Sequence, residues 1–76
     1  MEIKIISFGK IAAITGGELL VRDVADTDSL RTVLEANYPE LQSTKYVVAV
    51  QKNIIRENTI LQQGTEVALL PPFSGG

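Results

Sequence analysis

One segment alone has the pattern of a long amphipathic helix, and this limits what the remaining residues can build. Apolar residues recur at helical spacing from Leu30 to Tyr38, after a cluster of helix N-cap residues at positions 26–29. Pro39 disfavours helical geometry at the residue before it, so we expect the helix to end at Tyr38. Its single apolar stripe predicts that the helix packs on one surface only.

The segments on either side have the shorter patterns of β-strands. Alternating or β-branched apolar residues predict strands at residues 3–8, 18–24, 46–50, 54–55 and 66–70. A short helical turn is expected at residues 10–14. The polar residues 51–53 predict a hairpin turn, and residues 57–63 a connection with room for a single helical turn.

With 76 residues the chain forms one domain, and a domain of this size buries only about 60% of the surface that its unfolded chain exposes. The order of elements predicts an α+β fold of the ubiquitin-like β-grasp type, in which one main helix packs across one face of a mixed sheet of about five strands. This domain spans residues 1–70, and an extended, flexible tail follows at residues 71–76. The expected core residues are Ile3, Ile5, Val21, Leu30, Val33, Leu34, Val48, Val50, Val67 and Leu69.

The absence of cysteine and histidine narrows the chemistry that the side chains can perform. Without cysteine there is no disulfide, thiolate or zinc–thiolate site. Without histidine the commonest general base and the commonest metal ligand are missing. We therefore expect no metal site and no stably bound cofactor.

The formal net charge of −2 provides no basic surface for nucleic acid or for an anionic membrane. The first residues carry charge and lack the apolar run of a signal peptide. No apolar stretch approaches the roughly 20 residues that span a bilayer. We expect a cytoplasmic protein that binds neither nucleic acid nor membranes.

The most informative segment is the end of the chain. Its last ten residues have no charged side chain, so the only charge there is the terminal carboxylate. Pro71 and Pro72 stop the last strand and begin a stiff, extended segment that reaches roughly 20 Å over six residues. Gly75 and Gly76 lack Cβ atoms, which lets them pass through a narrow channel and leaves the carboxylate unhindered.

Residues 66–76 resemble the end of the small subunit of molybdopterin synthase, a ubiquitin-like sulfur-carrier family. The family pattern there is an acidic residue, Val, Ala, two large apolar residues, Pro-Pro, one apolar residue, Ser or Thr, and Gly-Gly. Residues 49–51 resemble the family's Ala-Val-Asn, and Gly64 precedes the last strand as in the family. The chain departs from the family at Gln51, usually Asn, and at Ala12, where many members have Arg.

The resemblance implies a cycle centred on Gly76. An adenylating, E1-like enzyme uses ATP to convert the Gly76 carboxylate to a glycyl adenylate, and a sulfur donor protein converts this to a thiocarboxylate, 1-thioglycine. The loaded tail enters the large subunit of molybdopterin synthase, commonly in a complex of two small and two large subunits. Sulfur then passes to cyclic pyranopterin monophosphate. The chain would not be an enzyme on its own, because the active site would lie in the large subunit.

Side-chain parity predicts a docking surface beside the tail. If Ile5 and Leu69 point into the core, Phe8 and Leu70 emerge on the open face of the sheet. The resemblance adds Ile54 to the same surface and Phe73 as an anchor within the tail. Gly75 is a further expected partner-binding residue in the tail.

Other functions share these features. A sulfur carrier for thiamine or for tRNA thiolation also ends in Gly-Gly, but such carriers usually lack the Pro-Pro-apolar-Ser/Thr segment before it. A ubiquitin-like modifier would begin with the same activation of Gly76 and end in an isopeptide bond to lysine. A plain binding module would use no terminal chemistry at all.

Overall fold

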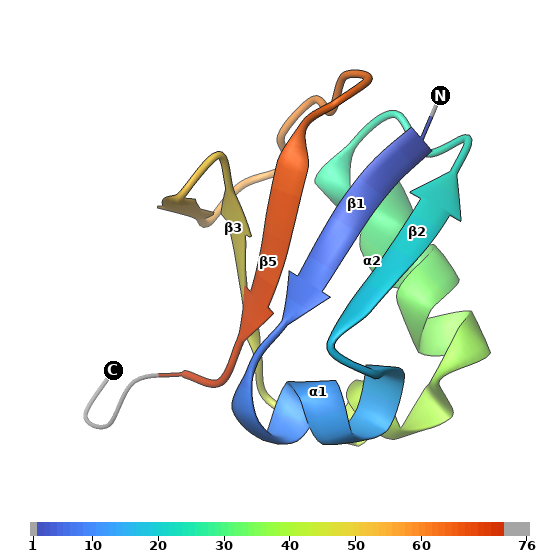
Figure 1. Cartoon of the computed structure of the whole chain (residues 1–76), viewed down its shortest axis with the longest axis vertical. Helices are drawn as coiled ribbons and strands as arrows, with labels where there is room; N and C mark the ends of the chain where they lie inside the picture. The colour runs from blue at the N-terminus through green and yellow to red at the C-terminus, as the bar shows by residue number, and fades with distance from the viewer. Residues whose placement is uncertain (1, 73–76) are drawn as a thin grey trace.

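A mixed five-stranded sheet with helices packed against it forms the body of the computed structural model, which describes residues 2–72 (Figure 1). The main helix, α2, lies across one face of the sheet, and the short helix α1 lies at the end of the sheet where the chain leaves it (Figure 1). In chain order the elements are β1 (Glu2–Ser7), α1 (Gly9–Thr15), β2 (Glu18–Arg22), α2 (Thr27–Asn37), the 3₁₀ helix η1 (Pro39–Ser43), β3 (Val47–Val50), β4 (Asn53–Ile55) and β5 (Glu66–Leu70).

The strand order, β2-β1-β5-β3-β4, places the first and the last strand next to each other near the middle of the sheet. β1 and β5 run parallel, with Ile5 opposite Val67, whereas every other neighbouring pair is antiparallel. β5 is therefore hydrogen-bonded on both sides. The segment that follows Leu70 leaves from the centre of the sheet, not from an edge.

Local signals at both ends of α2 explain its length. The Asp26 side chain caps the helix by accepting a hydrogen bond from the Ser29 backbone N–H at 2.8 Å. Asn58 supplies a second acceptor, to which the Asp28 N–H donates at 2.9 Å. The helix ends at Asn37, and Tyr38 is its C-terminal cap immediately before Pro39, as the sequence predicts. Pro39 then begins η1, which the sequence pattern did not predict.

The capping interaction predicts a specific acid sensitivity of the fold. Hydrogen bonds with the side chain and the backbone of Ser29 lower the pKa of Asp26 below its ordinary value. Because the folded pKa is the lower one, this stabilisation is present above the unfolded pKa of about 3.9 and is lost as pH falls through the folded value. Asp26→Asn keeps an acceptor but cannot titrate. We expect urea unfolding to show a smaller loss of stability between about pH 6 and about pH 3 in Asp26→Asn than in the wild type.

Glu57→Gln removes another exposed carboxylate and serves as the matched control for this experiment. Its loss of stability between the two pH values should be close to that of the wild type. If Asp26→Asn and the wild type lose the same stability on acidification, the cap does not contribute in the way described.

The predicted core is almost wholly confirmed. Every predicted core residue is buried except Val33, which is partly buried and packs against the others. The core also contains four residues that the prediction omitted: Ile11, Val24, Leu41 and Leu61. These side chains come from α1, from η1 and from irregular connections.

Three local predictions differ from the structure. The second strand ends at Arg22 instead of residue 24, because Asp23 has a positive φ of 61°. The hairpin turn consists of Gln51 and Lys52 alone, with φ of 50° and 71°, the signature of a two-residue turn that favours Asn-Gly. Residues 57–63 contain no helical turn. They run alongside the start of α2, where the Leu61 N–H donates to the Ala25 carbonyl at 2.8 Å.

Candidate functional site

Gly9 and Pro71 approach each other closely at the point where the chain leaves the sheet. The Phe8 N–H donates to the Leu69 carbonyl at 3.0 Å, so pairing between the two central strands continues past the end of β1. Gly9 has a φ of +56°, and a Cβ added there would lie 2.8 Å from Pro71 Cγ. A side chain at position 9 would be strained by its backbone angle and would also push against a rigid ring. The start of α1 therefore lies next to the point where the tail leaves the sheet.

Pro71 and Pro72, the first two residues of the predicted tail, are both partly buried. Three predicted site residues, Phe73, Gly75 and Gly76, lie outside the described residues. The structure therefore describes the origin of the tail and two surfaces close to it.

The first surface is an apolar depression of about 370 Å³ on the open face of the sheet. We call the surface formed by Phe8, Ala49, Ile54, Ala68 and Leu70 the apolar depression. Ala49 and Ala68 face each other across β3 and β5, and Ile54 pairs with Ala49 on β4. Two small side chains surrounded by larger ones make this part of the sheet concave. Lys52 and Glu66 also line it.

Three of the predicted partner-binding residues meet in the apolar depression. Phe8 is 47% exposed and Ile54 is 45% exposed, while Leu70 is partly buried. Ile5 and Leu69 are fully buried, so the parity argument places Phe8 and Leu70 on the correct face. An exposed aromatic and an exposed Ile beside each other form the kind of apolar patch that marks interaction surfaces.

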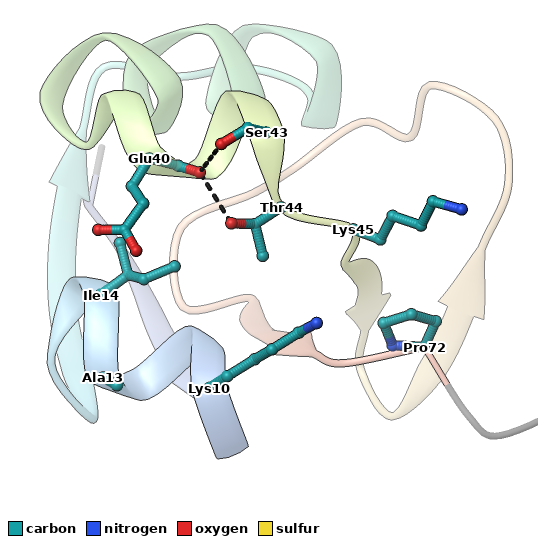
Figure 2. A pocket seen from close by; sticks show the side chains of 8 residues that line it. All are labelled: Lys10, Ala13, Ile14, Glu40, Ser43, Thr44, Lys45 and Pro72. Carbon is teal, nitrogen blue, oxygen red and sulfur yellow. Dashed lines mark hydrogen bonds between the residues drawn. The ribbon is translucent and has the colours of Figure 1, made fainter.

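The second surface is a more polar groove of about 550 Å³ beside Pro72 (Figure 2). We call it the lysine groove and define it by Lys10, Glu40, Thr44, Lys45 and Pro72. Lys10 belongs to α1, whereas Lys45 lies between η1 and β3. The hydroxyls of Ser43 and Thr44 donate to the Glu40 carbonyl at 3.2 and 2.8 Å, which fixes the turn that carries Lys45. Sequence reasoning did not identify this groove.

The most strongly perturbed ionisable group lines neither surface. Burial, followed by a hydrogen bond to Glu35, raises the pKa of Tyr46 far above its ordinary value. The Tyr46 hydroxyl donates to Glu35 Oε2 at 2.7 Å, and the Arg31 guanidinium lies 5.3 Å from the centre of the ring. This phenol stays protonated and joins α2 to the start of β3. We assign it to the fold and not to a reaction.

The described residues around the origin of the tail form two surfaces suited to binding. Residues 2–72 contain no group of three acidic, His or Cys side chains placed to hold a metal ion. No helix in the same range is long and apolar enough to cross a membrane. Around the origin of the tail the structure presents an apolar depression, two ammonium groups and two hydroxyls. Such an arrangement can orient the end of the chain in a partner.

Comparison with known proteins gives consistent results. The ThiS family profile matches residues 5–76. The molybdopterin synthase sulfur carrier subunit of Chlamydomonas reinhardtii is 32% identical over 83 aligned positions, which cover all of both chains. Among solved structures, the complex of subunits 1 and 2 of molybdopterin-converting factor from Helicobacter pylori 26695 contains a chain that matches with a TM-score of 0.74 and 26% identity, again over all of both chains.

Two archaeal structures show the same fold at lower identity. Small archaeal modifier protein 1 from Haloferax volcanii matches with a TM-score of 0.79 and 21% identity over all of both chains. Its counterpart from Methanosarcina acetivorans matches with a TM-score of 0.81 and 23% identity, covering 99% of this chain and 96% of the other. These likenesses confirm the predicted ubiquitin-like β-grasp fold and carry no argument about activity.

Proposed function

Because the chain belongs to the ThiS family, we propose that it is the sulfur carrier of molybdopterin synthase and works through its C-terminal glycine, Gly76. The observation that carries this proposal is the full-length match to a molybdopterin synthase sulfur carrier subunit. The geometry adds support, since the end of the chain starts from the centre of the sheet and from a contact between Gly9 and Pro71.

The proposed cycle has three steps. A carboxylate is a poor electrophile, so an adenylating E1-like enzyme first joins the Gly76 carboxylate to the α-phosphate of ATP and releases pyrophosphate. The terminal sulfur of a persulfide on a sulfur donor protein then attacks the acyl carbon and AMP leaves. A second thiol cleaves the resulting S–S bond, so that a thiocarboxylate remains on Gly76 and a disulfide on the donor. Finally, the thiocarboxylate sulfur attacks cyclic pyranopterin monophosphate in the large subunit, and water cleaves the acyl–sulfur bond, which restores the Gly76 carboxylate.

The chain itself contributes the carried sulfur and the docking surface. ATP is consumed by the activating partner and is not bound stably by the carrier. The side chains needed for catalysis belong to the partners, which agrees with a sequence that lacks both His and Cys. The cycle takes place in the cytoplasm.

Intact-mass measurement on the protein isolated from cells tests the chemistry directly. Replacement of one oxygen by sulfur raises the mass by about 16 Da. Conjugates of much higher mass would instead indicate a ubiquitin-like modifier, and unmodified protein would indicate a plain binding module. Reconstitution with the large subunit and cyclic pyranopterin monophosphate separates this carrier from one for thiamine or tRNA thiolation. Only the proposed function yields molybdopterin.

The apolar depression leads to a binding prediction. Phe8→Ala and Leu70→Ala should each weaken binding to the activating enzyme and to the large subunit by more than about 1 kcal/mol, since both remove apolar area beside the tail. Isothermal titration calorimetry gives the affinities. Ile60→Ala is the matched control, because Ile60 is 68% exposed and lines none of the apolar depression.

Circular dichroism must show that each variant is folded at the temperature of the titration, since Leu70 is partly buried. If both partners bind the Phe8 and Leu70 variants as tightly as the wild type, the apolar depression is not a docking surface. In the same series, Ile54→Ala and Phe73→Ala test the two residues that the family resemblance added.

A further inference from the structure

Two lysines from separate parts of the chain line the groove beside the origin of the tail. Lys10 at the start of α1 and Lys45 after η1 line one groove together with Pro72. Figure 2 shows the Lys10 side chain extending toward Pro72 and the Lys45 side chain extending outward from the rim of the groove, whereas the Glu40 carboxylate lies beside Ile14. The groove is separate from the apolar depression, with which it shares no residue.

Lys10 and Lys45 differ from Lys4 and Arg22 and resemble Lys52 and Arg56, which also form no ion pair with a carboxylate of residues 2–72. Lys4 pairs with Glu18 at 3.3 Å, and Arg22 pairs with Glu2 at 3.1 Å. Within residues 2–72, by contrast, no carboxylate forms an ion pair with Lys10 or with Lys45. Glu40 is the one acidic residue among those lining the groove. The lysine groove is therefore a net cationic surface in a chain whose formal net charge is −2.

The proposed adenylation gives this surface a physical use. The terminal carboxylate must approach the triphosphate of ATP, so two anions have to be brought together. The overall negative charge of the carrier adds to that repulsion. Favourable charge contacts elsewhere in the interface can offset it, and they act most effectively within about 8–10 Å of each other at physiological salt. A cationic surface at the origin of the tail is well placed for this.

We propose that Lys10 and Lys45 form an electrostatic clamp that binds an acidic surface of the adenylating enzyme beside the mouth of its tail channel. The inference rests on the proposed function, because it concerns the partner that activates Gly76. The occupant is a protein surface carrying Asp or Glu. It is not the nucleotide itself, which reacts at the far end of the tail. The two lysines are positioning residues and take no part in the chemistry.

The test is ATP–pyrophosphate exchange by the purified adenylating enzyme with the full-length carrier as the varied substrate. The double variant Lys10→Gln/Lys45→Gln should raise the KM for the carrier about fivefold or more at low salt, with kcat unchanged. At about 0.5 M salt the difference should fall below about twofold, because screening then acts over a few ångströms. Two control variants accompany this measurement. Lys4→Gln removes one cation on β1, and Lys10→Arg/Lys45→Arg keeps both positive charges of the groove. Both controls should retain the wild-type KM.

A variant with the opposite sign makes the test sharper. Glu40→Gln removes the acidic side chain of the groove without touching the lysines, so it should lower the KM.

Failure of the proposed function and failure of the clamp are distinguishable. If the wild type supports no exchange at all, the proposed function fails. If the wild type is active but the glutamine double variant has the same KM and the same salt dependence, the clamp does not exist. A fall in kcat at unchanged KM would also overturn it, since positioning at the mouth of the channel would then not be the role of these lysines.

Discussion

Removal of Gly76 should abolish adenylation and sulfur delivery while leaving the melting temperature of the domain unchanged. The reactive carboxylate would then belong to Gly75, and the shorter tail would stop one residue short of the nucleotide. The buried core is formed by residues 3–69, and Gly76 lies well beyond the end of β5 at Leu70. The deletion should therefore abolish the two activities without affecting folding. Pyrophosphate exchange and molybdopterin formation with purified partners give the two activities.

Addition of one residue after Gly76 is the complementary change. It restores length but moves the reactive carbon by about 3.5 Å, and displacements of this order are costly when a reacting group must be aligned. The extended and the truncated chain should both retain affinity for the partners through the apolar depression. Titration calorimetry serves as the control for correct folding and docking. Molybdopterin formed by the truncated chain would refute the assignment of Gly76 as the reactive residue.

Truncation of Leu34 should have the largest effect on stability. Leu34 is fully buried on α2 and belongs to the core between the helix and the sheet. Leu34→Ala removes three carbon atoms from a packed site and should cost roughly 2–5 kcal/mol. Small domains have only about 5–15 kcal/mol of stability in total, so this change brings the chain close to unfolding at moderate temperature. Urea denaturation followed by circular dichroism measures the loss.

Val33→Ala is the matched control on the same helix. Val33 is partly buried and only packs against the edge of the core, so its truncation should cost clearly less. The comparison tests which face of α2 meets the sheet. Equal losses for the two variants, or a wild-type melting temperature for Leu34→Ala, would contradict the packing of α2 described above.

The parts of the fold that depend on local sequence were predictable. The end of α2 follows from the steric effect of Pro39 on the residue before it, and its start follows from the capping side chain of Asp26. Strands with alternating or β-branched apolar residues were found within a few residues of their observed ends. Leu41 and Leu61 were missed, because η1 and the irregular connection before β5 have no periodic pattern.

The same distinction between local and long-range features applies to the candidate site. Parity along single strands was enough to place Phe8 and Leu70 on the open face, and the family resemblance added Ile54. By contrast, the contact of Gly9 with Pro71 joins residues near opposite ends of the chain. Lys10 and Lys45 likewise share a groove only because α1 packs beside η1. Periodicity within one element carries no information about such pairs. A glycine between a strand and a helix was the one local signal available for Gly9.

The parallel pairing of β1 with β5 also governs the order in which the protein can form. β5 comes after every other strand in the chain, yet it fills the slot between β1 and β3. During synthesis the middle of the sheet cannot form until β5 has emerged. Until then β1 lacks its parallel partner, which lies almost a full chain length away in the sequence. Pairings of such long range form late and slowly. A partner that recognises the apolar depression, which includes Ala68 and Leu70 of β5, would therefore select chains whose folding is finished. Recognition through this surface would then include a check that the fold is complete.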